Sequence, residues 1–295
     1  MQVTALRLYP VKSMAGIEVG AAVVEPWGLA GDRRWALVDT AGATVTAREV
    51  HELLGLSAEP VEGRPADWPA VRISDRAGAQ IVVEAPLGAA PVPVGLSRQG
   101  SALPAGGEAS EWLSKRLGVD VRLVWQDDPT ARSINPAEGG RPGETLSLAD
   151  AGPLLLVTEA SMRRLNEWIA ADAALPDVAD IHPADLSGDG MVADGVSPEL
   201  SIVRFRANVV LDGDEPFAED GWSTLRIGDV EFRTTAPCDR CVMTTVDPVT
   251  LRGGKEPIRT LARHRRWDGK TWFGTRLAPL DTGTIMVGGE VRVIS

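Results

Sequence analysis

The first part of the chain consists of short segments in which apolar and polar side chains alternate, with Gly and Asp between them. Alternation with a period of two places one set of side chains on each face of a strand. Turn residues at short intervals favour strands joined by hairpins, and many short strands favour a closed or barrel-like sheet. The expected strands are residues 3–9, 19–25, 34–39, 44–48, 71–74 and 80–84.

A change of pattern near the middle of the chain suggests a domain boundary. Residues 108–117 have the spacing of an amphipathic helix, and residues 119–125 read as a strand after it. Residues 127–147 are polar and rich in Pro and Gly, which is typical of a linker or long loop. We therefore predict two domains, residues 1–126 and residues 127–295.

The second domain is expected to mix helices with strands. Residues 153–157 form an apolar run typical of a buried strand, and Thr158 is placed to cap a helix over residues 159–168. A second helix is expected at residues 258–264, and a hairpin around Gly288 and Gly289 within residues 284–294. The predicted class is α+β with mostly antiparallel, barrel-like sheet. The remaining expected strands are residues 209–211, 225–227, 230–234 and 242–246.

Charge and cysteine content exclude several classes of protein. With 41 acidic and 30 basic residues the net charge is -11, which disfavours general nucleic-acid or anionic-membrane surfaces. The N-terminus carries no apolar signal segment, and no uninterrupted apolar stretch reaches the roughly 18 residues of a spanning helix. Two cysteines in 295 residues cannot form a disulfide framework, so a reducing, cytoplasmic location is expected.

Acidic and basic residues are clustered in two segments of the second domain. No Lys or Arg occurs between Arg164 and Arg204, where eight acidic residues predict a mobile acidic loop. A later basic set could guide an acidic electron-transfer partner or an anionic substrate, or could be an ordinary solvated helix face. This set is Arg252, Lys255, Arg259, Arg263, Arg265, Arg266 and Lys270.

The chain contains only incomplete matches to common catalytic and nucleotide-binding motifs. Gly269-Lys270-Thr271 lacks the first glycine of a P-loop, because His264 stands in its place. Gly188-Asp189-Gly190 follows no predicted strand and is not accepted as a dinucleotide fingerprint. His51-Glu52 has no second histidine at helical spacing, and no G-x-S-x-G elbow is present.

The most informative segment is the pair Cys238 and Cys241 in Pro-Cys-Asp-Arg-Cys-Val-Met-Thr-Thr-Val-Asp-Pro. A structural zinc site needs four N or S ligands, but the three histidines are scattered. A thioredoxin-type dithiol should open a helix, whereas strand-like residues follow here. Two buried, inert thiols are a further alternative. The remaining explanation of the pair is a single thiolate that binds a metal, with Arg240 beside it to stabilise negative charge.

This segment, with Lys255-Glu256-Pro257 after it, resembles the signature of MOSC proteins, a family that includes the mitochondrial amidoxime-reducing component and its bacterial relatives. Matching motifs extend over nearly the whole chain in the same order. They include Tyr9-Pro-Val-Lys-Ser13, Gly28-Leu29, Asp32-Arg-Arg-Trp35, Leu155-Leu-Val-Thr-Glu-Ala-Ser161 and Arg204-Phe-Arg-Ala-Asn208. The resemblance implies an N-terminal β-barrel domain packed on a MOSC domain, with a molybdenum cofactor (Mo-molybdopterin) held between them.

The resemblance also implies roles for individual residues. Cys241 is expected to ligate molybdenum. The cofactor's phosphate and pterin are expected to contact Lys12, Ser13, Arg33, Arg206, Asn208, Asp239 and Arg240. Arg and Lys suit a phosphate, but taken singly the arginines could be surface charges. An aspartate at position 239 is a less favourable neighbour for a phosphate than a serine. Met14 and Ala207 also replace the cysteine and proline often found in these motifs.

The implied reaction is reduction of small N-hydroxylated compounds, with two electrons from an external electron-transfer protein or reductase. No nucleic-acid or membrane partner is expected. An iron–sulfur cluster is not expected either, because the chain has no cysteines beyond the pair. The alternative is a cofactor carrier or sulfur-transfer module, because related domains occur in molybdenum-cofactor sulfurases.

Overall fold

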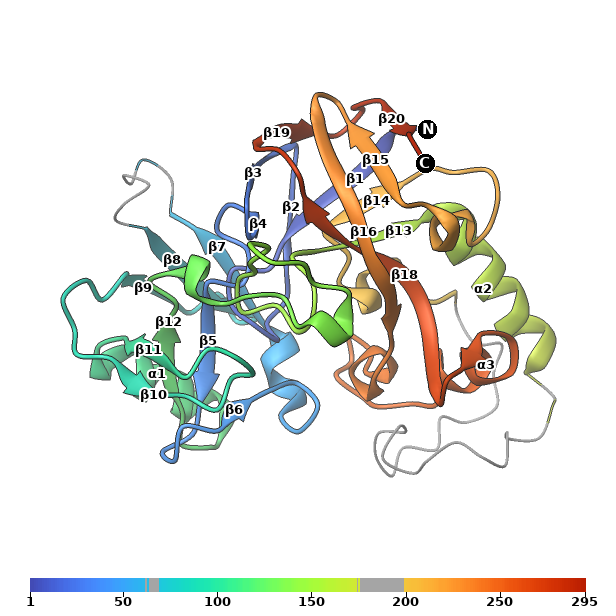
Figure 1. Ribbon diagram of the computed structural model, residues 1–295. Coiled ribbons are helices and arrows are strands. Elements are labelled where there is room, and N and C mark those ends of the chain that lie inside the picture. Colours follow the sequence, from blue (N-terminus) through green and yellow to red (C-terminus); the bar gives the residue numbers. More distant parts are fainter. Residues whose placement is uncertain (62, 64–68, 174, 176–198) are drawn as a thin grey trace.

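The computed structural model describes residues 1–61, 63, 69–173, 175 and 199–295, and Figure 1 shows two packed units. One unit holds the short strands from β5 to β12 together with helix α1. The other holds a long sheet, with helices α2 and α3 beside it. Most of the predicted acidic loop lies outside the described residues. In the described part of the chain, no helix is long and apolar enough to cross a membrane.

The first unit contains a five-stranded and a three-stranded antiparallel sheet around one apolar core. Helix α1 (Gly107–Leu117) covers this core with Ala109, Leu113 and Leu117, which share one face at four-residue spacing. Gly118 ends the helix in the left-handed region, φ 68°. In sheet order the strands are β10 (Val92–Pro93), β11 (Ser101–Pro104), β12 (Arg122–Trp125), β5 (Trp35–Val38) and β6 (Thr44–Val45), then β7 (Leu56–Pro60), β8 (Ala70–Asp75) and β9 (Gln80–Glu84).

The second unit is built on a nine-stranded sheet that is apolar on both faces at its centre. Strand β13 (Leu154–Thr158) is buried throughout, because one face packs into the strand core and the other under α2 (Glu159–Asp172) and α3 (Ile258–His264). β13 runs parallel to β14 and antiparallel to β18. The sheet order is β2 (Ile17–Val19), β1 (Val3–Leu8), β14 (Val209–Leu211), β13, β18 (Lys270–Pro279), β16 (Val230–Asp239), β15 (Thr224–Ile227) and β20 (Val291–Val293), with β17 (Arg266–Trp267) pairing β18.

The beginning of the chain belongs to sheets of the second unit. Strand β1 pairs with β14, about two hundred residues later, and Leu6 lies opposite Val209. Strand β3 (Ala21–Glu25) pairs with β4 (Gly28–Leu29) and with β19 (Gly283–Met286). The chain crosses into the first unit only after this point, so the two units share the N-terminal segment. The predicted division at residue 126 stays a prediction.

Several predicted elements are confirmed. Thr158 caps α2, because its hydroxyl oxygen accepts a hydrogen bond from the Ser161 amide at 3.1 Å. Helix α3 has the predicted bounds, and α1 and β9 agree within one residue. The predicted loop at 127–147 contains only short 3₁₀ turns. The 3₁₀ helices are η1 (His51–Gly55), η2 (Pro129–Ala131), η3 (Pro136–Glu138), η5 (Ile202–Phe205), η6 (Ala218–Gly221) and η7 (Val242–Thr245).

The strand predicted at residues 242–246 is wrong, because residues 242–245 form the 3₁₀ helix η7. The last paired residue of β16 is Asp239, opposite Trp272, and the Arg240 amide still donates to the Thr271 carbonyl at 2.8 Å. Because β18 begins at Lys270, the residues after Arg240 have almost no strand left to pair with. The hydroxyls of Thr244 and Thr245 instead donate to carbonyls three residues back, at 3.0 and 2.8 Å. These bonds favour a helical turn over an unpaired strand.

The hairpin predicted over residues 284–294 is also wrong. A turn does form, since the Gly289 amide donates to the Met286 carbonyl at 3.0 Å. The two strands then diverge, because β19 pairs with β3 and β20 pairs with β15. Ile285 and Val291 reach the same apolar core from these two different sheets.

Candidate functional site

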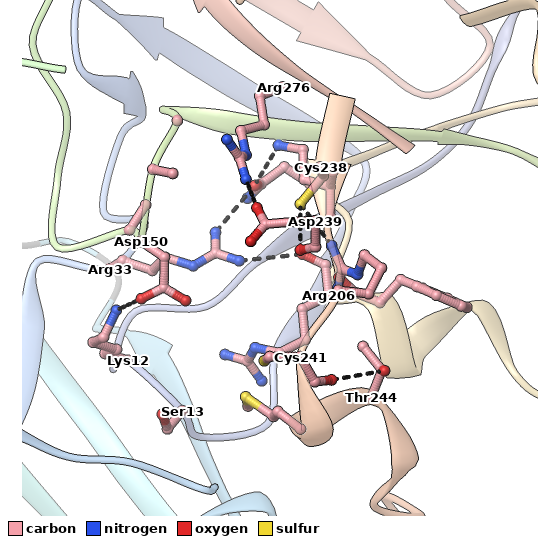
Figure 2. A pocket seen from close by; sticks show the side chains of 18 of the residues that line it. Lys12, Ser13, Arg33, Asp150, Arg206, Cys238, Asp239, Cys241, Thr244 and Arg276 are labelled. Carbon is pink, nitrogen blue, oxygen red and sulfur yellow. Dashed lines mark hydrogen bonds and ion pairs between the residues drawn. The ribbon is translucent and has the colours of Figure 1, made fainter. Parts of the chain in front are cut away.

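A cavity of about 310 Å³ lies where loops from the first unit meet the C-terminal ends of β16 and η5. Figure 2 shows labelled side chains that come from distant parts of the sequence and line this space. All eight residues proposed from the sequence are among its lining residues, although their roles toward a cofactor stay a prediction. They are Lys12, Ser13, Arg33, Arg206, Asn208, Asp239, Arg240 and Cys241.

Three of these residues have backbone conformations that L-amino acids seldom adopt. The φ angles of Ser13, Arg33 and Arg206 are 69°, 49° and 57°, in the left-handed region. Arg206 reaches this region because it ends η5, where its amide donates to the Val203 carbonyl at 3.0 Å. Such conformations cost about 1–3 kcal/mol each and concentrate at ligand sites. Their convergence on one cavity makes it the candidate functional site.

The ring of Tyr9, the chain's one tyrosine, supports two of the cavity's cations. The guanidinium carbons of Arg33 and Arg206 lie 4.6 and 4.2 Å from the centre of this buried ring. Both contacts lie within cation–π range. Gly16 makes room for the ring, because a Cβ atom built there would lie 2.4 Å from a ring carbon.

The guanidiniums of Arg33 and Arg206 differ in how many of their N–H groups have hydrogen-bond partners. Arg33 bonds to the carboxylate of Asp32 at 2.5 Å and to the side-chain oxygen of Asn208 at 3.0 Å. Asn208 is buried and also binds backbone groups, so in this structure it positions Arg33. Arg206 donates from Nη1 to the Met14 carbonyl, but its buried Nη2 has no hydrogen-bond partner in the described part of the chain. Burial, with a contribution from the charge of Arg33, lowers the pKa of Arg206 to about 10.

Arg240 is a second cavity arginine with an unsatisfied N–H group, because its buried Nε has no hydrogen-bond partner within the described ranges. Its other nitrogens donate to the Cys238 sulfur at 2.8 Å and to the Phe205 carbonyl at 2.9 Å. Among the residues that the structure describes, neither Arg206 nor Arg240 has an acidic partner. These two guanidiniums therefore keep N–H groups that an anionic ligand in the cavity could satisfy.

The two cysteines are free thiols in different local structures. Cys238 lies near the end of β16, whereas Cys241 immediately precedes η7. The strand expected after Cys241 was the reason for setting a dithiol site aside, so that reason is removed. The helix that replaces it has four residues and follows Cys241, not Cys238. In the described ranges no group of three or more His, Cys, Asp or Glu side chains is arranged to hold a metal.

Sequence reasoning missed several residues that shape the cavity. Asp150 forms a close ion pair with Lys12, and Arg276 forms close ion pairs with Glu138 and Asp239. Asp239 is therefore neutralised, which removes the expected conflict with a nearby phosphate. Asp150 and Arg276 belong to no local motif, so only the folded chain reveals them. Seven Lys and Arg side chains line the cavity against three acidic ones: Lys12, Arg33, Arg48, Arg204, Arg206, Arg240 and Arg276 against Glu138, Asp150 and Asp239.

The basic set after residue 250 is largely neutralised by the protein itself. Arg265 pairs closely with Asp220, and Lys270 lies 3.6 Å from Asp239. Arg259 pairs with Glu256 at 2.5 Å, and Arg263 lies 3.8 Å from Asp172. These internal pairs reduce the positive field available to attract an acidic partner.

Comparison with known proteins agrees with this architecture. The model of the MOSC domain matches residues 143–292, and that of the MOSC N-terminal beta barrel domain matches residues 1–120. The chain therefore belongs to the MOSC family, and the predicted α+β class with an N-terminal barrel domain is confirmed.

Relatives of two kinds match over nearly the whole chain. It is 31% identical over 279 residues to the molybdenum cofactor sulfurase of Danio rerio, covering 93% of this chain and 31% of that protein. It is 28% identical over 311 residues to mitochondrial amidoxime-reducing component 1 of Homo sapiens, covering 99% and 82%. The chain thus spans about a third of such sulfurases. The crystal structure of the YuaD protein from Bacillus subtilis aligns with a TM-score of 0.40 and 11% identity, covering 98% of this chain and 93% of that one.

Proposed function

We propose that this protein is a molybdenum-cofactor-binding oxidoreductase that reduces small N-hydroxylated compounds with electrons from an external donor. One observation carries the proposal: the buried, unpartnered nitrogens of Arg206 and Arg240 share a cavity with Cys241. This is a donor set for an anionic ligand beside a thiol that can bind a metal. The amidoxime-reducing relatives supply the reaction class.

The cavity fits the proposed cofactor chemically. In this proposal Arg206, Arg240 and Arg33 hold the phosphate, with Lys12, Ser13, Asn208 and Asp239 around the phosphate and pterin. Cys241 supplies one thiolate to the metal. When bound, the cofactor supplies the two-electron redox chemistry that the side chains themselves lack. The protein's own contribution is to fix the orientation of the cofactor and to surround it with preorganised cations.

The net reaction defines what else is needed. An N–OH group, two electrons and two protons give an N–H group and water. The sequence offers no accepted nucleotide fingerprint, so we propose a separate electron-transfer protein or reductase as the donor. Because most of the basic set after residue 250 in this protein forms internal ion pairs, we do not propose that set as the docking surface for the donor. A cytoplasmic location is also proposed, because both thiols are free.

The test uses protein made in a host that synthesises molybdopterin. We expect molybdenum bound near one equivalent, and reduction of benzamidoxime when reduced viologen is supplied. NADH alone should give no turnover, and adding a suitable reductase should restore it. Molybdenum-loaded protein that reduces no N-hydroxylated compound with viologen would contradict the proposed activity.

A cofactor carrier or sulfur-transfer module is the second candidate, favoured by the similarity to molybdenum cofactor sulfurases. A carrier should pass its cofactor to an apo-molybdoenzyme at a rate faster than spontaneous release. It should also show no turnover with viologen. The same loaded preparation therefore separates the two functions.

A further inference from the structure

Arg48 lines the cavity but belongs to none of the motifs described above. It lies in the turn after β6, where the amides of Glu49 and Val50 both donate to the Thr46 carbonyl, at 3.2 and 3.0 Å. The preceding residue, Ala47, is fully buried in the core of the first unit. This anchoring holds the backbone of Arg48 in place and sends its side chain across to the second unit.

The guanidinium of Arg48 lies beside the thiol proposed to bind the metal. Arg48 and Cys241 line the same cavity, and Nη2 of Arg48 is 3.4 Å from a carboxylate oxygen of Asp150. Its side chain is 42% exposed, whereas that of Lys12 is 12% exposed. Arg48 is therefore the cation that an arriving compound can reach next to Cys241.

The other cavity cations are already committed. Lys12 holds Asp150 closely, Arg204 pairs with Asp247 at 2.5 Å, and Arg276 holds two carboxylates. The proposed function assigns Arg33, Arg206 and Arg240 to the cofactor. Asp150 satisfies Arg48 only in part, because the contact is long and the same carboxylate binds Lys12.

We infer that Arg48 determines substrate class, selecting N-hydroxylated compounds that also carry an anionic group such as a carboxylate or phosphate. This inference rests on the proposed function. The planar guanidinium offers two parallel N–H donors, which match two oxygens of either group. With the anion held at Arg48, the N–OH end of a small compound is directed toward Cys241.

Matched pairs of compounds test this inference and distinguish the two anions. Benzamidoxime is compared with 4-carboxybenzamidoxime, and N4-hydroxycytidine with its 5′-monophosphate. Each is assayed with reduced viologen on the holoprotein, on Arg48→Gln and on Arg48→Lys. Arg48→Lys keeps the positive charge but loses the two parallel N–H donors of the guanidinium. Arg292→Gln, on β20 at the edge of the long sheet, is the matched surface control.

For wild type we expect a higher kcat/KM for at least one anionic compound than for its neutral partner. Arg48→Gln should lower kcat/KM for that anion about tenfold or more, the loss expected for one charged hydrogen-bonded pair. The neutral partner should change less than twofold, Arg48→Lys should fall between, and Arg292→Gln should match wild type. Equal losses for charged and neutral compounds, or loss of molybdenum from Arg48→Gln, would overturn the inference.

Binding without turnover provides the independent readout. Calorimetric titration of the same compounds, with no electron donor, should show weaker binding of the preferred anion to Arg48→Gln and unchanged binding of its neutral partner. If no compound is reduced by any donor, the proposed function fails, and this titration still decides the role of Arg48. Identical affinities in wild type and Arg48→Gln would refute it.

Discussion

Replacement of Tyr9 by leucine should weaken cofactor binding, although Tyr9 itself does not line the main cavity. The ring supports both Arg33 and Arg206, at 4.6 and 4.2 Å. A cation–π contact in a partly desolvated site contributes about 1 kcal/mol, so losing two costs about 2 kcal/mol. That free energy corresponds to a roughly thirtyfold weaker affinity.

A matched variant separates the ring from the hydroxyl. The Tyr9 hydroxyl donates to the Ala207 carbonyl at 3.3 Å, a long bond of low strength. Tyr9→Phe keeps the ring and should bind the cofactor nearly as wild type does. Gly16→Ala should reproduce the Tyr9→Leu defect, because its Cβ atom would displace the ring.

The assay is molybdenum and pterin content after extended dialysis, measured beside the free energy of unfolding in urea. Stability must be recorded because a buried aromatic residue is being shortened. Equal cofactor retention by Tyr9→Leu and Tyr9→Phe, both folded, would refute the idea that the ring organises the two arginines.

Three further predictions concern the thiols, the cavity cations and a buried carboxyl. Cys241→Ala should abolish molybdenum retention while Cys238→Ala keeps most of it; equal loss from both would indicate a dithiol site. Arg206→Gln should cost about 1.5–3 kcal/mol of cofactor binding, measured by equilibrium dialysis, because one charged hydrogen bond is lost; an unchanged affinity would remove Arg206 from the site. Burial raises the pKa of Glu219, so its contribution to stability is full below the unfolded-state pKa and falls as pH rises through the folded value. The unfolding free energy of Glu219→Gln relative to wild type should therefore increase between pH 5 and pH 8, and a flat difference in urea titrations would contradict this.

Residues within continuous motifs could be predicted from the sequence, including their meeting in one cavity. Lys12, Arg33 and Arg206 belong to such motifs, and all three line it. Arg48 and Asp150 were missed because their contact is tertiary, across 102 positions of sequence. No local pattern distinguishes a charge that will face a cavity from one that will face water.

The wrong elements have a related cause. Val242 to Val246 has strand-like composition, but a strand forms only where a neighbouring strand can pair with it, and β18 begins at Lys270, close to where its pairing with β16 ends. Gly288 and Gly289 do form the predicted turn, yet neighbouring sheets provide better partners for the strands on either side. The local sequence correctly predicted the turn, but it could not specify which strands pair with β19 and β20.

The shared N-terminal segment governs when this protein can become functional during synthesis. Arg206 donates to the Met14 carbonyl at 2.6 Å across 192 positions, and the edge of β1 that does not pair with β2 pairs with β14. At 5–20 residues per second, Val209 of β14 leaves the ribosome roughly ten to forty seconds after Leu6 of β1. During that interval β1 has an unpaired edge, which exposes the nascent chain to wrong pairing. A ligand that needs both Lys12 and Arg240 can bind only after translation has passed the cysteine pair, so binding of such a ligand follows nearly complete synthesis.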